Sequence, residues 1–324
     1  MARRALITGI TGFVGSHLAE HLISCGWEVG GFDIRPSFPA GCPGIPVRLW
    51  TGDLRKPADI DAALAGFDPG IVFHLAAEAA TTRAAADPVG AVARTIEATV
   101  VLCEAIKRLK RRPELFITGS AAVYGRVAAA DLPVREESPL RPNSSYGVAK
   151  AAQELYGWQY RESAGLRVFI TRSFNATGPR QSPDFFLPHV CREVARREAG
   201  QEAGRPVPVG SLDVERDYLD VRDMVRAYEA LAGASAAEGR PVNVCSGRTV
   251  RLSEIAERVR GAARVAVSFE TDPARVPLSQ ADVIVGDPGR LASLTGFAPR
   301  HRIDDTVGEV LEYERRLVRD AQGR

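Results

Sequence analysis

A tyrosine and a lysine stand four residues apart in the segment YGVAK, residues 146–150. In a helix this spacing places the phenol of Tyr146 and the ammonium of Lys150 on one face, where both can reach one point in a cleft. A phenol near its usual pKa of about 10 is a poor acid–base group at neutral pH, but a nearby positive charge stabilises the phenolate. The pair therefore predicts proton transfer by Tyr146, with Lys150 as its electrostatic partner.

Ser120 comes just after an apolar run that ends near Thr118, and before Tyr146 in the chain. Its hydroxyl can donate a hydrogen bond to a substrate oxygen whose charge changes during a reaction. We expect Ser120, Tyr146 and Lys150 to form one catalytic group.

A glycine-rich turn, GITGFVG, lies between an apolar run at residues 5–8 and a helical stretch at residues 16–25. Such a turn lets the backbone approach a pyrophosphate, whose charge the N–H groups at the start of a helix stabilise. The sequence therefore predicts a dinucleotide site, and the turn contributes the following residues to it: Gly9, Thr11, Gly12, Phe13, Val14 and Gly15.

Asp33 ends the second apolar run, where a carboxylate can accept hydrogen bonds from the adenosine ribose. This favours NAD. Arg35 could instead pair with a 2′-phosphate, so NADP stays open. Further cofactor contacts are expected after the third and fourth apolar runs, at Asp53, Leu54, Leu75, Ala76 and Ala77.

Apolar runs alternate with helical stretches through the first half of the chain. This alternation predicts βαβ units and a parallel sheet, and right-handed crossovers then give a Rossmann-type doubly wound α/β fold. Beyond about residue 175 the alternation loosens and prolines become frequent. We expect a dinucleotide-binding domain at residues 1–174 and mainly a smaller substrate lobe at 175–324, with later strands returning to the sheet from about 240–250.

Composition limits the classes of function. The 324 residues carry 42 Lys+Arg against 40 Asp+Glu, a net charge of only +2, which does not favour nucleic acid as a partner. Five cysteines lie far apart without a CxxC pair, so reduced thiols are expected rather than a zinc site. Without a leader or an apolar run of about 20 residues, we expect a soluble, cytoplasmic protein.

The motifs GITGFVG, GSAAVYG and YGVAK together resemble the extended short-chain dehydrogenase/reductase superfamily, also called the NAD-dependent epimerase/dehydratase superfamily. The resemblance covers nearly the whole chain. In the second half, the segments RSFNATGPRQ (172–181), VGSLDVERDYLDVRD (209–223) and NVCSG (243–247) are similar to the GDP-mannose branch, most closely to the GDP-4-keto-6-deoxy-D-mannose reductases.

This resemblance implies an enzyme that acts on a nucleotide-diphosphate sugar, with a GDP-hexose favoured. Asn175 and Arg216 would hold the diphosphate, with Arg180 a further candidate, since guanidinium groups suit phosphate oxygens. The full set of implied substrate-binding residues is Ser120, Ala121, Asn175, Arg180, Val209, Arg216 and Arg275.

The chain also departs from the superfamily pattern. Dehydratases carry an acidic residue just after the catalytic Ser or Thr, whereas Ala121 and Ala122 stand here, which disfavours dehydration. The helix asparagine usual in the superfamily is replaced by Thr95, and Arg275 is the nearest substitute for a late diphosphate-binding arginine.

The first interpretation is a reductase that transfers hydride from NAD(P)H to a sugar C4 ketone. The alternative is an NDP-hexose 4-epimerase with tightly bound NAD, which Asp33 supports and for which the same three catalytic residues serve. A non-enzymatic dinucleotide sensor is disfavoured because all three are kept, and a simple alcohol dehydrogenase because Asn175 and Arg216 would lack a diphosphate to bind.

The helix expected at residues 146–164 carries apolar residues at Ala149, Ala152, Leu155 and Tyr156, a spacing consistent with packing. The resemblance implies a homodimer that forms through the long helices beside the active site.

Overall fold

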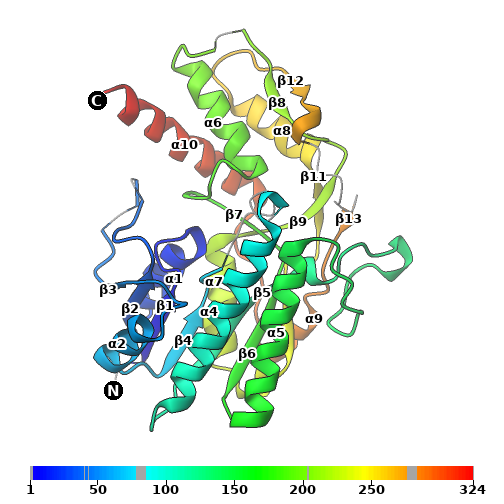
Figure 1. The fold of residues 1–324 in the computed structure, drawn as a ribbon. Helices are drawn as coiled ribbons and strands as arrows, with labels where there is room; N and C mark the ends of the chain where they lie inside the picture. Colours follow the sequence, from blue (N-terminus) through cyan, green and yellow to red (C-terminus); the bar gives the residue numbers. More distant parts are fainter. Residues whose placement is uncertain are drawn as a thin grey trace.

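The computed structural model describes residues 3–39, 41–42, 44–77, 85–202, 204–275 and 283–323. The described chain forms a parallel sheet with helices on both faces, and a smaller cluster of helices and short strands above one end of it (Figure 1). The doubly wound fold predicted from the alternating apolar runs is confirmed.

The main sheet has seven strands in the order β10-β6-β5-β4-β1-β2-β3, and every pairing is parallel. Buried parallel strands are expected to be almost continuously apolar, as they are here. The strands are β1 (Arg4–Thr8), β2 (Glu28–Asp33), β3 (Arg48–Thr51), β4 (Ile71–His74), β5 (Glu114–Ser120), β6 (Val168–Ser173) and β10 (Pro241–Val244).

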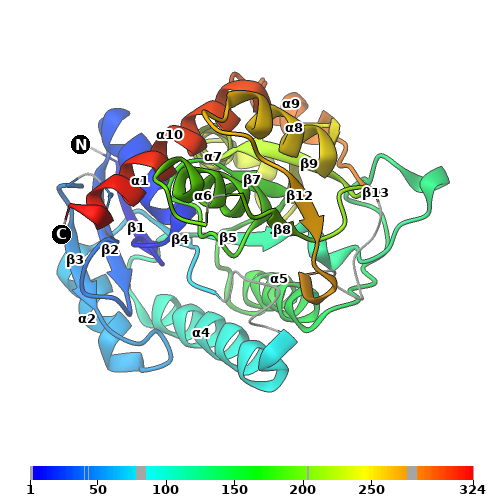
Figure 2. The same cartoon turned by 90° about the horizontal axis from the view of Figure 1, so that it is seen from above.

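Helices cover both faces of this sheet. On one face lie α2 (Pro57–Phe67), α4 (Pro88–Arg108) and α5 (Ser145–Ala164), and Figure 2 shows α4 and α5 side by side. Their apolar residues form one core with the sheet, which includes Ile60, Leu102 and Tyr160. The opposite face carries α1 (Phe13–Ser24), α7 (Val221–Ala232) and α9 (Gly289–Thr295), whose core includes Leu18, Met224 and Leu291.

The smaller part is built from short strands and three helices around a separate apolar cluster that includes Val190, Ile255 and Val310. Its helices are α6 (Phe186–Glu198), α8 (Leu252–Ala262) and α10 (Ile303–Gln322). Its strands are β7 (Asn175–Thr177), β8 (Val207–Val209), β9 (Glu215–Asp220), β11 (Thr249–Arg251), β12 (Phe269–Thr271) and β13 (Val283–Ile284).

The strands of the main sheet are parallel, so their carboxyl ends meet at one edge, where ligands of such folds bind. The predicted catalytic and cofactor residues end or follow strands β1 to β5 at this edge, or belong to α1 or α5. In Figure 1 the smaller part lies above the same edge.

All five cysteines are free, and Cys103, Cys191 and Cys245 are buried, as expected for reduced thiols. Within the described residues, none of the helices combines the length and the apolar character that a membrane crossing requires.

Candidate active site

Lys150 lies on the buried face of α5, at the carboxyl end of β5. Its side chain is only 5% exposed, and its ammonium donates hydrogen bonds to the backbone oxygen of Thr118 at 2.8 Å and to Oε1 of Gln153 at 2.9 Å. Burial lowers the pKa of Lys150 from 10.5 to about 8, because it disfavours the charged form. The lysine is held in place by its partners and remains mostly charged at neutral pH.

Tyr146 lies in the first turn of α5, one turn before Lys150. The helix begins there because the hydroxyl of Ser144 accepts a hydrogen bond from the backbone N–H of Gly147 at 3.1 Å, a typical N-cap. A Cβ atom at Gly147 would lie 2.6 Å from the carbonyl oxygen of Ala122. Glycine therefore lets the start of α5 approach the 3-10 turn η1 (Ala121–Val123), which directly follows Ser120.

Ser120 is the last residue of β5 and caps η1, since its hydroxyl accepts a hydrogen bond from the N–H of Ala122 at 3.2 Å. It pairs with Ser173 across the β5–β6 ladder. The structure thus brings the ends of β5 and β6 and the first turns of α5 together, as the prediction of a single catalytic group requires.

Two further hydroxyls lie beside this group and were not singled out in the sequence. Ser173 and Tyr228 of α7 share a hydrogen bond of 2.7 Å. Burial raises the pKa of Tyr228, and a negative charge on Tyr146 would raise it further. No local motif marks Tyr228, because it reaches the site only through the packing of α7 on the sheet.

The glycine-rich turn forms a tight cradle between β1 and α1. A Cβ atom at Gly15 would collide with the carbonyl oxygen of Gly9, so a larger residue could not be accommodated without a shift of the backbone. The turn meets the end of β4, where the N–H of Ala76 donates to the hydroxyl of Thr8 at 3.3 Å. Thr11, Gly12, Phe13 and Val14 complete the turn and the start of α1.

Asp33 braces this turn. It is 6% exposed, and its two carboxylate oxygens accept hydrogen bonds from the backbone N–H groups of Thr11, at 2.9 Å, and Arg35, at 3.0 Å. The guanidinium of Arg35 lies 3.7 Å from the same carboxylate, with about half of its side chain exposed. Asp33, which would recognise a ribose, and Arg35, which would recognise a 2′-phosphate, therefore lie side by side.

The other predicted cofactor residues lie along the same edge. Leu54 is buried after β3, whereas the carboxylate of Asp53 pairs with Arg55 at 2.5 Å. Leu75, Ala76 and Ala77 follow β4 and are partly buried.

This arrangement fits a dinucleotide. The turn is lined by backbone rather than by side chains, and it opens at the start of a helix, where N–H groups attract phosphate. The residues that would hold the cofactor are the glycine-rich turn, Asp33 or Arg35 at the adenosine, and Lys150 at the reacting end.

Asn175 and Arg216 come together in the smaller part of the structure. In the β7–β9 ladder, Asn175 pairs with Tyr218, two residues beyond Arg216 on the same strand, so all three side chains project to one face. Asn175 donates to the backbone oxygen of Asp217 at 3.0 Å, and Arg216, which is 9% exposed, donates to that of Glu215 at 2.7 Å.

The remaining predicted substrate residues have different surroundings. The guanidinium of Arg180 pairs with Glu20 of α1 at 2.5 Å and is 8% exposed, so it ties the segment after β7 to the first helix. Val209 is buried in β8, and Ala121 is buried in η1. Arg275 is exposed, and its guanidinium lies 3.4 Å from the carboxylate of Asp272.

A further acidic residue, Asp217, organises the loops beside Arg216. Its fully buried carboxylate accepts hydrogen bonds from the N–H groups of Ser246, Gly247 and Gly286 and from the hydroxyl of Ser246, at 2.6 to 3.2 Å. Burial raises its pKa, although these hydrogen bonds act in the opposite direction. The segments 209–223 and 243–247 are thus held together by one carboxylate.

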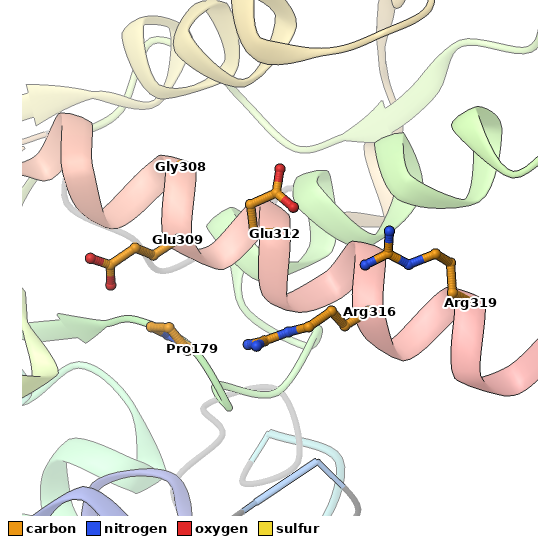
Figure 3. Close-up of a pocket in the computed structure, with 6 residues that line it drawn as sticks. All are labelled: Pro179, Gly308, Glu309, Glu312, Arg316 and Arg319. Carbon is orange, nitrogen blue, oxygen red and sulfur yellow. The ribbon is translucent and has the colours of Figure 1, made fainter.

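A pocket of about 370 Å³ lies elsewhere, between α10 and the segment that carries Pro179 (Figure 3). In Figure 3, Glu309 and Arg316 project from α10 into the space above Pro179. Its lining contains none of Ser120, Tyr146 and Lys150, so we do not place the reaction there.

The chain is similar to known proteins over nearly its whole length. The chain is 32% identical to the GDP-6-deoxy-D-mannose reductase of Pseudomonas aeruginosa, over 98% of this chain and 99% of that protein. It is also 29% identical to the UDP-glucose 4-epimerase of Mycolicibacterium smegmatis, over 96% and 98% of the two chains.

Solved structures show the same kinship. The structure of RMD from Pseudomonas aeruginosa complexed with NADPH superposes with a TM-score of 0.85 at 30% identity, covering 98% of this chain and 100% of that one. A UDP-glucose 4-epimerase from Thermus thermophilus in complex with NAD gives 0.84 at 28% identity, covering 96% and 99%.

The model of the GDP-mannose 4,6-dehydratase family matches residues 6–310, nearly the whole chain. That match spans the glycine-rich turn, the catalytic group and the Asn175–Arg216 face. This chain belongs to the GDP-mannose 4,6-dehydratase family, within the extended short-chain dehydrogenase/reductase superfamily.

Proposed function

We propose that this protein is an NAD(P)H-dependent reductase that converts the C4 ketone of an NDP-4-keto-6-deoxyhexose, in particular GDP-4-keto-6-deoxy-D-mannose, into an alcohol. The observation that carries the proposal is the surroundings of Ser120. The site keeps Ser120, Tyr146 and Lys150, but the turn after Ser120 holds Ala121 and Ala122, and the first acidic residue after it is Asp131, which is exposed.

This composition supports reduction over dehydration. Elimination of water needs a base to remove a proton from carbon and an acid for the leaving hydroxyl. The two alanines supply neither group, although the family takes its name from dehydratases. When a cofactor supplies the hydride, reduction of a ketone needs only one proton donor from the protein, at the sugar oxygen.

Each residue then has a defined role. A bound reduced nicotinamide supplies the hydride to C4 of the sugar. Tyr146 donates a proton to the C4 oxygen, so the ketone gains a hydride and a proton and becomes an alcohol. Ser120 orients that oxygen by a hydrogen bond, and the charge of Lys150 stabilises the phenolate left on Tyr146.

We also propose that Asn175 and Arg216 bind the diphosphate of the sugar nucleotide. Their side chains share one face of the small sheet, and a guanidinium with an adjacent amide suits phosphate oxygens. Residues 1–174 would then bind mainly the dinucleotide and 175–324 mainly the sugar nucleotide. The 32% identity to a reductase of a GDP sugar supports GDP as the nucleotide.

A homodimer and a cytoplasmic location complete the proposal. The free cysteines fit a reducing compartment. On the outer face of α5, Val148, Leu155 and Trp158 are 46%, 61% and 45% exposed, an apolar stripe that a second copy of the chain would cover.

A 4-epimerase is the second candidate. Asp33, beside the glycine-rich turn, suits the unphosphorylated ribose of NAD, and an epimerase is 29% identical over nearly the whole chain. In that case the same three residues would remove hydride from a sugar and return it to the other face, without net use of cofactor.

One experiment separates the two candidates. Purified protein is mixed with NADPH or NADH and GDP-4-keto-6-deoxymannose, and nicotinamide absorbance is followed together with the mass of the sugar. Stoichiometric loss of reduced cofactor with a gain of two hydrogens establishes the reductase. Without that loss, interconversion of GDP- or UDP-hexoses at constant mass, with NAD found in the protein, would establish the epimerase.

A further inference from the structure

A chain of buried hydrogen bonds runs from Lys150 on α5 to α4 and then to the strands β4 and β1. Oε1 of Gln153 accepts from Lys150 at 2.9 Å, and Nε2 of Gln153 lies 3.0 Å from the hydroxyl of Thr99 on α4. The same hydroxyl lies 3.0 Å from Nε2 of His74, whose Nδ1 lies 2.9 Å from the hydroxyl of Thr8. The four residues that continue the chain beyond Lys150 are all fully buried.

The orientation of the Gln153 carboxamide follows from donor counting at Lys150. An ammonium can only donate, so the atom of Gln153 that faces it must be the oxygen. The amide NH₂ group therefore points toward Thr99, which must act as its acceptor. The two ends of the side chain demand the same orientation.

The hydroxyl oxygen of Thr99 can act as this acceptor because the hydroxyl proton is already donated to another group. Its hydroxyl donates to the backbone oxygen of Thr95, one turn earlier on α4, at 2.8 Å. The oxygen can therefore accept from both Gln153 and His74. This fixes His74 as the tautomer that carries its proton on Nε2, and leaves Nδ1 to accept from Thr8.

The chain ends at the predicted cofactor site. With its proton donated to His74, the hydroxyl of Thr8 accepts from the N–H of Ala76, beside the glycine-rich turn. Burial, and then the charge of Lys150, lowers the pKa of His74 to about 3, so the imidazole stays neutral. Every hydrogen bond in the chain consequently has one direction at neutral pH.

We propose that Gln153, Thr99 and His74 are positioning residues for Lys150, and that their hydrogen-bond chain keeps a carbonyl oxygen, never an NH₂ group, against the ammonium. Because the importance of Lys150 rests on the proposed function, the test below uses cofactor binding, which needs no sugar substrate. Two of the three ammonium N–H groups are used by Thr118 and Gln153, which leaves one to serve the cleft.

The titration of Lys150 also depends on the titratable side chains around it, among them Tyr146 and His74. Tyr146 lies one turn before Lys150 on α5, and His74 of β4 is reached from Lys150 through Gln153 and Thr99. His74 is neutral at neutral pH, because burial and the charge of Lys150 lower its pKa to about 3. The acceptors at Thr118 and Gln153 therefore offset the cost of burying this ammonium.

Two substitutions at Gln153 should act in opposite directions. The readout is the affinity of the free protein for NADPH, from nicotinamide fluorescence between about pH 6 and pH 10, where we expect a loss of affinity centred near pH 8 in the wild type. Gln153→Met removes the acceptor at similar size and should move this transition about one pH unit lower. Gln153→Glu adds an anionic acceptor and should move it about one unit higher.

Thr99 tests the chain at a distance, since it touches Gln153 and His74 but donates nothing to Lys150. The nearly isosteric Thr99→Val removes the hydroxyl and should also move the transition to lower pH. Thr99→Ser keeps a hydroxyl and should leave the transition at the wild-type pH. Thr306→Val is the control: it deletes another buried threonine hydroxyl, which donates to Asp220 at 2.7 Å, and should leave the transition in place.

A purely structural role would weaken binding equally at every pH. The proposal is wrong if the transition stays at the wild-type pH in Gln153→Met and Gln153→Glu, or if both variants move it in the same direction. It is also wrong if the transition of Thr99→Ser is shifted as far as that of Thr99→Val. A wild-type protein that binds NADPH with this pH dependence but does not reduce the sugar would overturn the proposed function and leave the positioning chain supported.

Discussion

The ammonium of Lys150 donates a 2.8 Å hydrogen bond to the backbone carbonyl of Thr118, two residues before Ser120. This bond joins the face of α5 that carries Tyr146 to the end of the strand that carries Ser120. Because the carbonyl belongs to β5 itself, the distance between the proton donor and the orienting hydroxyl depends on the rigidity of the sheet. The contact therefore converts two separate motifs into one site.

Tyr146→Phe should abolish turnover while it leaves the fold and cofactor binding nearly intact. Loss of a general acid lowers rates by about 10² to 10⁴-fold, and the ring itself is retained. The measurement is kcat with saturating cofactor, together with NADPH affinity by fluorescence. Tyr156→Phe, on the same helix, is the control and should keep the wild-type rate. Retained activity in Tyr146→Phe would remove this residue from its assigned role.

Cofactor affinity should fall as the pH rises through about 8. The pKa of Lys150 is lowered to about 8 by burial, so the lysine is charged below this pH and neutral above it. Loss of one charged hydrogen bond is expected to weaken NADPH binding by about tenfold. Lys150→Met should show weak binding without this transition, whereas Lys107→Met, at an exposed lysine of α4, should retain it. An unchanged transition in Lys150→Met would assign the titration to another group.

Arg35→Ala should change the affinity for NADPH and the affinity for NADH by different amounts. If the guanidinium binds a 2′-phosphate, its removal weakens NADPH by about tenfold or more and leaves NADH almost unchanged, because only NADPH carries that group. Equilibrium titration of both cofactors is the measurement. Arg55→Ala, at an arginine paired with Asp53 nearby, serves as the control. Equal weakening of NADH and NADPH by Arg35→Ala would show that Arg35 does not read the phosphate.

Asp217→Ala should destabilise the fold strongly. The substitution leaves three backbone N–H groups without their acceptor, at a cost of about 3 kcal/mol or more in the free energy of unfolding. Urea denaturation measures this change. Asp213→Ala, at an exposed aspartate four residues earlier, should stay within about 0.5 kcal/mol of the wild type. A similar small effect for Asp217→Ala would contradict its role as an organiser of the loops.

Trp158→Glu should convert the proposed homodimer into a monomer. The charge would lie in the apolar stripe of α5, next to Leu155, where its burial against a second copy is costly. Light scattering gives the mass in solution. Val265→Glu places the same charge at an exposed apolar residue outside α5 and should leave the mass unchanged. A wild-type protein that is monomeric at working concentration would remove the dimer from the proposal.

The sequence by itself determined the parts of the site that depend on local spacing. Gly9, Gly12 and Gly15 between a strand and a helix predict the phosphate turn, and Tyr146 and Lys150 share a face because helical geometry repeats every 3.6 residues. The alternating apolar runs likewise predict the main sheet, since buried parallel strands must be apolar along their length.

Only the tertiary structure decided with which groups the charged side chains form ion pairs and hydrogen bonds. Arg180 follows a motif that suggests phosphate binding, yet it pairs with Glu20 from the first helix. Asp33 was expected to contact a ribose, and the structure shows that it also braces the glycine-rich turn. A guanidinium or carboxylate has the same chemistry whichever partner it meets, so its sequence neighbours do not specify that partner.

The same reason explains why Gln153, Thr99 and His74 were not predicted as a unit. They come from α5, α4 and β4, and no spacing along the chain relates them. Their hydrogen bonds exist because the packing of two helices against one sheet buries polar groups that must then satisfy one another. Local periodicity placed Tyr146 beside Lys150, whereas the closure of the fold determined what holds Lys150 in place.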